Sequence, residues 1–244
     1  MNNHRSNMKN GFMDIHHHLL YGMDDGAKDQ KMMQAMLVRA ATEGITRIVA
    51  TPHATPGLQR FEREKYAVAI REAAEFCVQE GLNLAVYEGA EILYTHQTTR
   101  FLQEGRIPTL AGTDRVLVEF SPDIPYRKLL DALEDLLHSG YLPVLAHVER
   151  YRCLAVFPHR AEKIKQQMDV FFQVNCRSVL AKGDFFENRF VRRMLKKQLV
   201  DALATDAHNL TTRRAQMKAA WRTVKRQYGT SYATRLTNGS LLYG

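Results

Sequence analysis

The feature that most constrains the fold is a repeated order: a short apolar or β-branched run, then a longer helical pattern. Seven such runs predict strands, and they are FMDI (12–15), RIVAT (47–51), LAVYEG (84–89), RVLVEF (115–120), PVLAH (143–147), FFQVN (171–175) and DALAT (201–205). Strand–helix units in series predict a parallel sheet. Continuous apolar strands such as 115–120 are typical of a sheet that is covered on both faces.

The segments between these runs carry apolar residues at three- and four-residue spacing, which predicts helices. Helices near 27–43, 62–80 and 125–139 each end at a glycine, the usual helix-stop residue. No Gly/Ser-rich linker, low-complexity segment or repeat divides the chain, so we expect one α/β domain over residues 1–244. A barrel of seven βα units fits best. An open doubly wound sheet stays an alternative, because periodicity does not reveal closure.

Composition and cysteine content bound the class of protein. The 244 residues are 45% hydrophobic and 25% charged, as in ordinary globular proteins. No stretch approaches the roughly 18 apolar residues of a membrane span, and the first ten residues lack the apolar core of a secretory signal. The three cysteines, Cys77, Cys153 and Cys176, have no zinc-like spacing. We therefore expect a cytoplasmic protein without a transmembrane segment or disulfide framework.

The net charge of +8 is unevenly distributed along the chain. The segment from Arg189 to Arg226 contains eleven Lys and Arg residues and only two acidic residues, Asp201 and Asp206, which gives it a net charge of +9. Solvated helix faces explain most of these charges, and a surface that attracts an anionic partner is the functional alternative. Aromatic residues are not interleaved with the basic ones, so we expect no nucleic-acid partner.

Polar residues of unusual type follow the predicted strands. In parallel α/β folds the C-terminal strand ends form the active-site rim, so these side chains are expected to converge in one cup. His16 and His18 follow the first strand and His53 follows the second, and the remaining members of the set are Glu91, Glu119, His147, Asp206 and His208.

Each of these residues is ambiguous alone, but the set predicts a metal site. Histidines two apart on an extended chain point to one side, whereas His17 between them should face away and pack. A carboxylate in the apolar run that ends at Glu119 needs a cation or strong donor nearby. Imidazoles and carboxylates without a thiolate favour Zn, Mn, Fe or similar ions. Their number indicates a multinuclear hydrolytic centre.

The ordered series DIHHH, MDDGAKD, TPH, GAEI, LVEF, LAHVERY and TDAHN resembles the PHP (polymerase and histidinol phosphatase) superfamily. More narrowly, it is similar to the bacterial PHP-type protein-tyrosine phosphatases of capsular and exopolysaccharide loci. DDGAKD and AHVERY are the most specific motifs. The likeness spans residues 12–243, which leaves residues 1–11 as an N-terminal extension.

The resemblance implies a distorted seven-stranded, TIM-like α/β barrel with three divalent ions, most simply Mn, with Fe, Zn or Mg as alternatives. Carried over by position, one ion takes His16, His18, Glu91 and Asp206. Glu91 bridges to a second ion held with Glu119 and His147, and Asp25, His53 and His208 hold the third. Asp24, next to Asp25, is expected to be a charge at a helix N-terminus.

The resemblance further implies that Arg150 and Arg213 contact the substrate phosphate, with Arg214 as a rival for the second role. Bidentate guanidinium contacts suit a phosphate and stabilise developing charge. The implied activity is hydrolysis of phosphotyrosine by metal-activated water. The implied partner is the phosphotyrosine-containing C-terminal tail of a bacterial tyrosine kinase that controls polysaccharide export. None of the cysteines begins a C-x5-R loop, so a phosphocysteine route is rejected.

Three alternatives stay open at this level. A histidinol-phosphate phosphatase or another small-molecule phosphoesterase would use the same cup. A non-catalytic regulator could dock a phosphorylated kinase tail, although the complete set of ligands argues against it. A barrel enzyme without a metal would show metal-independent activity. The oligomeric state, including a homo-oligomer, is not determined by the sequence.

Overall fold

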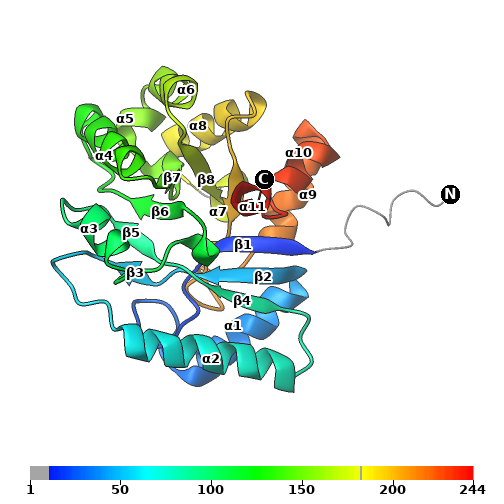
Figure 1. Cartoon of the computed structure of the whole chain (residues 1–244). Helices are drawn as coiled ribbons and strands as arrows, with labels where there is room; N and C mark the ends of the chain where they lie inside the picture. Colours follow the sequence, from blue (N-terminus) through cyan, green and yellow to red (C-terminus); the bar gives the residue numbers. More distant parts are fainter. Residues whose placement is uncertain (1–10, 182, 244) are drawn as a thin grey trace.

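The computed structural model describes residues 11–181 and 183–243. Apart from Gly11, the expected N-terminal extension lies outside the described residues. In this part of the chain, all paired strands run parallel and form two curled sheets (Figure 1). The first sheet has the order β1 (Phe12–His17), β2 (Ile45–Ala50), β4 (Ala85–Glu88). The second has the order β3 (His53–Ala54), β5 (Glu91–Leu93), β6 (Arg115–Glu119), β7 (Leu142–Leu145), β8 (Phe171–Asn175), β9 (Ala202–Ala204).

The seven predicted strands are confirmed, and the short strands β3 and β5 come in addition. They arise because the chain crosses from the first sheet to the second after β2 and again after β4. At the second crossing, a Cβ on Gly89 would lie 2.5 Å from the Val49 side chain, so only glycine fits there. The Tyr66 hydroxyl accepts from the Gly89 N–H at 2.8 Å and donates to its carbonyl at 3.1 Å. The break in the ladder thus keeps its backbone groups paired.

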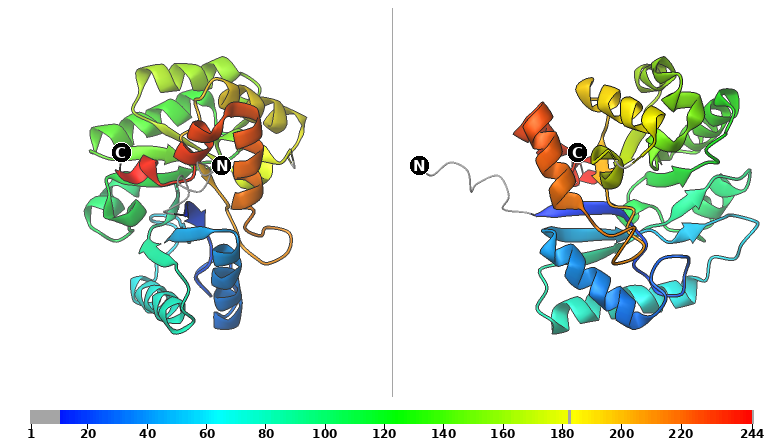
Figure 2. Two further views of the ribbon diagram at one scale, coloured as in Figure 1. Left: turned by 90° about the vertical axis from the view of Figure 1, so that its right-hand side faces the viewer. Right: turned by 180° about the vertical axis from the view of Figure 1, so that it is seen from behind.

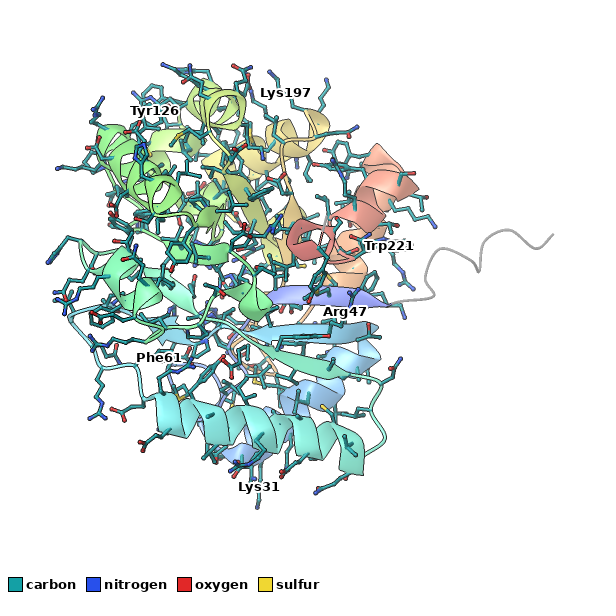
Figure 3. All side chains as sticks on the ribbon, viewed as in Figure 1. Lys31, Arg47, Phe61, Tyr126, Lys197 and Trp221 are labelled. Carbon is teal, nitrogen blue, oxygen red and sulfur yellow. The ribbon has the colours of Figure 1, made fainter. Side chains whose placement is uncertain are left out.

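Longer helices surround the sheets, as both views of Figure 2 show. Helices α1 (Gln30–Thr42) and α2 (Arg63–Gln79) lie on the outer side of the first sheet. The remaining helices are α3 (Thr98–Gln103), α4 (Tyr126–His138), α5 (Arg152–Ala155), α6 (Pro158–Gln167), α7 (Cys176–Val179), α8 (Phe185–Lys196), α9 (Met217–Tyr228), α10 (Thr230–Arg235) and α11 (Ser240–Tyr243). Charged side chains such as Lys31 and Lys197 project from these outer helices to solvent (Figure 3).

Two of the three predicted helix ranges are confirmed to within one residue, but the first begins later than expected. Helix α1 starts at Gln30 because Asp29 caps it, with its carboxylate accepting from the Met32 N–H at 2.8 Å. The prediction that Asp24 is a charge at this N-terminus is therefore wrong. Asp24 lies five residues before the cap, in the loop that follows β1.

The apolar core has an outer and an inner part. The outer part packs the helices against the sheets, for example Phe12 against Trp221 of α9 with ring centroids 5.9 Å apart. The inner part fills the space enclosed by the strands and includes Ile15, Val49 and Leu117. Leu241 and Leu242 of the C-terminal helix α11 belong to this inner cluster as well. Helix α11 therefore fills part of the barrel interior and acts as a plug.

Closure of the barrel joins β1 to the segment after β9. The Asp206 N–H donates to the His16 carbonyl at 2.9 Å, and the His18 N–H donates to the Ala207 carbonyl at 3.0 Å. At the other end of the two strands, the C-terminal segment lies between them: Met13 N–H donates to Thr237 O and Leu203 N–H to Leu236 O, both at 2.8 Å. The closed arrangement excludes the open doubly wound sheet.

The C-terminal segment is also held from the first sheet. Arg47 of β2, labelled in Figure 3, donates through Nη2 to the Asn238 carbonyl at 2.9 Å.

Among the described helices, none is both long and apolar enough to cross a bilayer.

The plug yields a prediction for stability. Leu242 is 2% exposed inside the barrel, so Leu242→Ala should lower the free energy of unfolding by about 2–4 kcal/mol, through lost burial and the cavity left behind. Tyr243→Ala, at a 57% exposed neighbour, should cost less than about 1 kcal/mol. Urea unfolding followed by circular dichroism measures both. Equal losses for the two variants would contradict a plug.

Candidate metal centre

The rim at the C-terminal strand ends gathers all nine side chains predicted as metal ligands. They come from β1 and its following loop, β3, β5, β6, and the segments after β7 and β9. Imidazole and carboxylate atoms of eight of the nine form three overlapping groups, each compact enough to surround one ion: His16, His18, Glu91 and Asp206; His18, Asp25, His53 and His208; and His53, Glu91 and Glu119. His147, which the resemblance assigned to an ion with Glu91 and Glu119, belongs to none of these groups, and His53 takes its place.

The first group is buried and matches the predicted first set residue for residue. The Nε2 atoms of His16 and His18 lie 3.0 Å apart, which confirms that residues two apart converge here. Glu91 Oε2 lies 3.1 Å from the first Nε2 and 3.2 Å from the second. Asp206 Oδ1 completes the group at 3.5 and 3.6 Å from the same two atoms.

The second group is the most open to solvent. Asp25 Oδ1 lies 3.4 Å from His53 Nε2 and 3.3 Å from His208 Nε2, and the Asp25 side chain is 63% exposed. The His208 ring stacks on the His18 ring with centroids 3.7 Å apart. His18 therefore borders both the first group and the second, a sharing that the sequence did not predict.

The third group is organised by two carboxylates. His53 Nδ1 lies 3.1 Å from Glu91 Oε2 and 3.3 Å from Glu119 Oε1. His147 approaches the same carboxylates from the other side, with Nε2 2.8 Å from Glu91 Oε1 and 3.6 Å from Glu119 Oε2. Glu91 thus contacts imidazoles from every group, which is the geometry of a bridging carboxylate.

Burial and charge strongly perturb the titration of these residues. Burial alone would raise the pKa of the Glu91 carboxyl, but the His16 charge and hydrogen bonds from His147, His16 and His18 hold it well below its ordinary value. Burial alone would lower the pKa of His16, but the Glu91 and Asp206 carboxylates raise it to about 10. His53 responds in the same way, with a pKa of about 9. Protons on imidazoles therefore balance the carboxylates when no other cation is present.

His208 differs from the other histidines. Burial and the nearby His18 charge lower its pKa to about 4, so its ring is neutral at physiological pH. Its Nδ1 lies 3.1 Å from the Asp206 carbonyl oxygen, and its Nε2 is buried without a hydrogen-bond partner among the described residues. A buried ring nitrogen with a free lone pair, facing a carboxylate, fits a metal ion. The residues present therefore suit divalent cations held by nitrogen and oxygen.

His17, expected to face away from its neighbours' cluster, is 1% exposed and belongs to none of the three groups. Burial lowers the pKa of its imidazole to about 3, so it is a neutral packed residue.

Several buried polar side chains that sequence reasoning missed surround the predicted ligands. Asp24 Oδ2 lies 2.6 Å from His18 Nδ1 and accepts from the His53 N–H at 3.0 Å. Gln173 and Asn175 of β8 contact His16 and Asp206, respectively. Polar residues alternating within FFQVN were the available signal, because alternate residues of a strand share one face.

The two predicted arginines lie beside the cluster. Arg150 Nη2 donates to Asp206 Oδ2 and Arg213 Nη2 to Asp206 Oδ1, both at 2.9 Å. Their side chains are 38% and 30% exposed, so both are partly accessible to solvent at the edge of the cluster. Arg214, the rival of Arg213, is exposed.

A closed parallel α/β barrel with this cup places the chain in the class of barrels that bind metal ions at the C-terminal rim of the strands. More narrowly, the chain belongs to the CpsB/CapC family of capsular polysaccharide synthesis, whose family model matches residues 12–240. The predicted resemblance to PHP-type phosphatases of capsular loci is confirmed.

Individual relatives agree with this assignment. The chain is 31% identical to the tyrosine-protein phosphatase CpsB of Streptococcus pneumoniae, across 92% of this chain and 94% of the relative. It is also 31% identical to the tyrosine-protein phosphatase YwqE of Bacillus subtilis, across 94% and 90%. A solved structure from a study of YwqE and CpsB as metal-dependent tyrosine phosphatases matches with a TM-score of 0.84 at 29% identity, covering 92% and 90%. A histidinol phosphate phosphatase of Lactococcus lactis shares the fold at 14% identity and a TM-score of 0.58.

The protonated imidazoles predict how metal binding depends on pH. Stability contributed by the protons on His16 and His53 is fully present below their unfolded pKa near 6.5 and is lost as pH rises through about 9 and 10. A divalent ion replaces these protons, so binding becomes tighter as pH rises. The increase in Tm on adding Mn²⁺ should therefore grow from pH 7 to pH 9.

Differential scanning fluorimetry under nitrogen measures this increment against a chelator-treated sample in the same buffer. The chelator-treated sample corrects for every group that titrates outside the cluster. An increment that stays constant or shrinks with rising pH would contradict the proton balance described here.

Proposed function

We propose that this protein is a metal-dependent protein-tyrosine phosphatase that acts in capsular or exopolysaccharide synthesis. The observation that carries the proposal is the buried Glu91 carboxylate, within 3.2 Å of nitrogens on His16, His18, His53 and His147. Family membership over residues 12–240 supports it, as do relatives that are named tyrosine-protein phosphatases. The same match supports one phosphatase domain over most of the chain.

We further propose that the cluster holds three divalent ions in the sets that the resemblance implies, with Mn as the first candidate. His16, His18, Glu91 and Asp206 would hold one ion. Glu91 would bridge to a second with Glu119 and His147, and Asp25, His53 and His208 would hold the third. Such ions supply a water of lowered pKa and neutralise charge on a transferring phosphoryl group.

The chain's own residues would bind and orient the substrate. Arg150 and Arg213 each present donors that are only partly engaged by Asp206, so their guanidinium groups can turn to phosphate oxygens. Two arginines on opposite oxygens of one carboxylate give a phosphate two charged contacts at a fixed separation. The charge that develops on phosphate oxygens in the transition state is stabilised by the same contacts.

The cysteines do not offer a competing route. Cys153 is partly buried in α5, and burial raises the pKa of its thiol, which lowers the fraction of the nucleophilic thiolate. Cys77 and Cys176 are buried, and burial raises the pKa of both thiols. All three are free cysteines, which supports a reducing cytoplasmic location.

The proposed substrate is a phosphotyrosine on the C-terminal tail of a bacterial tyrosine kinase. The names of the relatives support phosphotyrosine, and the family's place in capsule synthesis supports a kinase partner. The Arg-flanked, partly exposed rim is accessible to a side chain presented on a flexible segment.

The metal mechanism makes a sharp contrast between residues. His147→Ala or Asp206→Asn should reduce phosphatase activity by at least about 100-fold, because the first removes a ligand nitrogen from the buried cluster and the second removes the charge of a ligand carboxylate. Cys153→Ser should leave activity unchanged. Hydrolysis of a phosphotyrosine peptide, with chelator and after Mn²⁺ is restored, measures the effect, and circular dichroism verifies the fold. Activity that survives effective chelation, or depends on Cys153, would refute the proposal.

The two arginines make a second contrast. Arg150→Ala and Arg213→Ala should each lower kcat/KM for a phosphotyrosine peptide by about 10–100-fold, through the loss of a charge-assisted phosphate contact. Arg214→Ala is the matched control and should stay within about twofold of the wild type. Steady-state kinetics distinguish the three variants. If Arg214→Ala proved the most damaging, the assignment of phosphate binding to Arg213 would be wrong.

A further inference from the structure

Strand β8 carries none of the nine proposed ligands, yet it presents two buried amide side chains to the cluster. Gln173 is 0% exposed and Asn175 is 4% exposed. Two residues apart on one strand, they share a face, and β8 lies between β7 and β9, which lead to His147 and Asp206. Buried amides are costly unless they are hydrogen-bonded, so their partners indicate what they do.

The two amides form a continuous chain of hydrogen bonds between proposed ligands. The His147 N–H donates to Gln173 Oε1 at 2.8 Å, and the same oxygen lies 3.1 Å from His16 Nδ1. Gln173 Nε2 donates to Asn175 Oδ1 at 2.8 Å. Asn175 Nδ2 then donates to Asp206 Oδ2 at 2.8 Å. We call this chain of contacts the amide relay.

The two ends of the amide relay fix its direction. A backbone N–H at His147 can only donate, and the ionised carboxylate of Asp206 only accepts. Turning either amide over would place two donors or two acceptors face to face. Gln173 Oε1 must therefore accept, and a hydrogen bond to His16 requires the proton on His16 Nδ1. When His16 is neutral, as a metal ligand must be, its Nε2 lone pair is then free to face the cluster.

We propose that Gln173 and Asn175 are positioning residues that set His16 as an Nε2 ligand and fix the carboxylate of Asp206. The inference rests on the metal site of the proposed function. Asp24 acts in the same way on the neighbouring ligand, because its Oδ2 lies 2.6 Å from His18 Nδ1. Both histidines thus present Nε2 to one point, where these atoms lie 3.0 Å apart. Orienting contacts of this kind around a metal commonly contribute 10–100-fold in affinity.

The test compares Zn²⁺ affinity between variants, by competition with a chromophoric chelator. Gln173→Met keeps the side-chain length but removes both the acceptor and the donor, so it should bind Zn²⁺ about 10–100-fold more weakly. Asn175→Asp keeps an acceptor for Gln173 but places a second carboxylate against Asp206, so it should also weaken binding. Thr98→Val is the control: Thr98 is 1% exposed in α3, and its hydroxyl accepts from the Thr95 N–H.

A second readout follows the His16 proton directly. In Zn²⁺-loaded protein labelled with ¹⁵N-histidine, the wild type should show a His16 proton on Nδ1, protected from exchange by Gln173. In Gln173→Met this signal should be lost or should exchange rapidly, whereas Thr98→Val should retain it. A purely structural role for Gln173 would lower Tm without changing the His16 spectrum.

The outcomes separate the two levels of the proposal. If the wild-type protein binds no Zn²⁺ or Mn²⁺, the proposed function itself fails. If the wild type binds Zn²⁺ and Gln173→Met binds it equally well with an unchanged His16 signal, the amide relay is refuted and the metal site stands. If Gln173→Met does not fold, Asn175→Asp answers the question, because affinity within twofold of the wild type would overturn the inference.

Discussion

The rest of the site depends on one buried negative charge. Glu91 is 1% exposed, and an ionised carboxylate in such a place is stable only beside cations or strong donors. Four imidazoles from three segments meet it, at 3.1, 3.2, 3.1 and 2.8 Å: two at the end of β1, one on β3 and one after β7. The fold therefore has to bring β1, β3, β5 and β7 to one point, and the barrel is the arrangement that does so.

The barrel interior has a polar half at the rim and an apolar half below it. Above, the rim is polar and is organised by carboxylates and imidazoles. Below, the interior is apolar, with Met13, Ile15 and Leu117 packed against the C-terminal leucines of α11. Low polarity under the cluster strengthens each electrostatic contact above it. The plug formed by α11 thus contributes to stability by burying apolar surface.

Buried polar groups around the cluster limit how the proposed ligands can move. Asp14 accepts from the Thr205 N–H at 2.9 Å and so joins β1 to the end of β9 where the barrel closes. Burial raises the pKa of the Asp14 carboxyl to about 6, even though Thr205 donates to it. Asp24 contacts the proposed ligand His18, and the amides of β8 contact the proposed ligands His16 and Asp206. Preorganised polar groups of this kind leave little reorganisation for a bound phosphate to induce.

The sequence by itself determined the strands, the helix stops and the types of residue at the rim, because strand and helix periods and strand ends are local properties. It also placed eight of the nine candidate ligands, whereas Asp25 and the grouping of the ligands came from the family resemblance. Only the tertiary structure decided the register of the strands and the contacts that orient the ligands. The pairing of β1 with β2 is irregular between Asp14 and His17, the stretch that contains the first ligand, His16.

The prediction for Asp24 was wrong because an aspartate shortly before a helix has the same sequence pattern whether it lies at the helix N-terminus or contacts His18. Sequence reasoning missed Gln173 and Asn175 because their partners lie 157 and 31 residues away along the chain. It could not separate Arg213 from Arg214, since only the path of the loop after β9 turns one of them toward Asp206. The ligands are oriented by contacts between segments far apart in the sequence. Such contacts produce no periodic pattern in the sequence, so they could not be predicted from it.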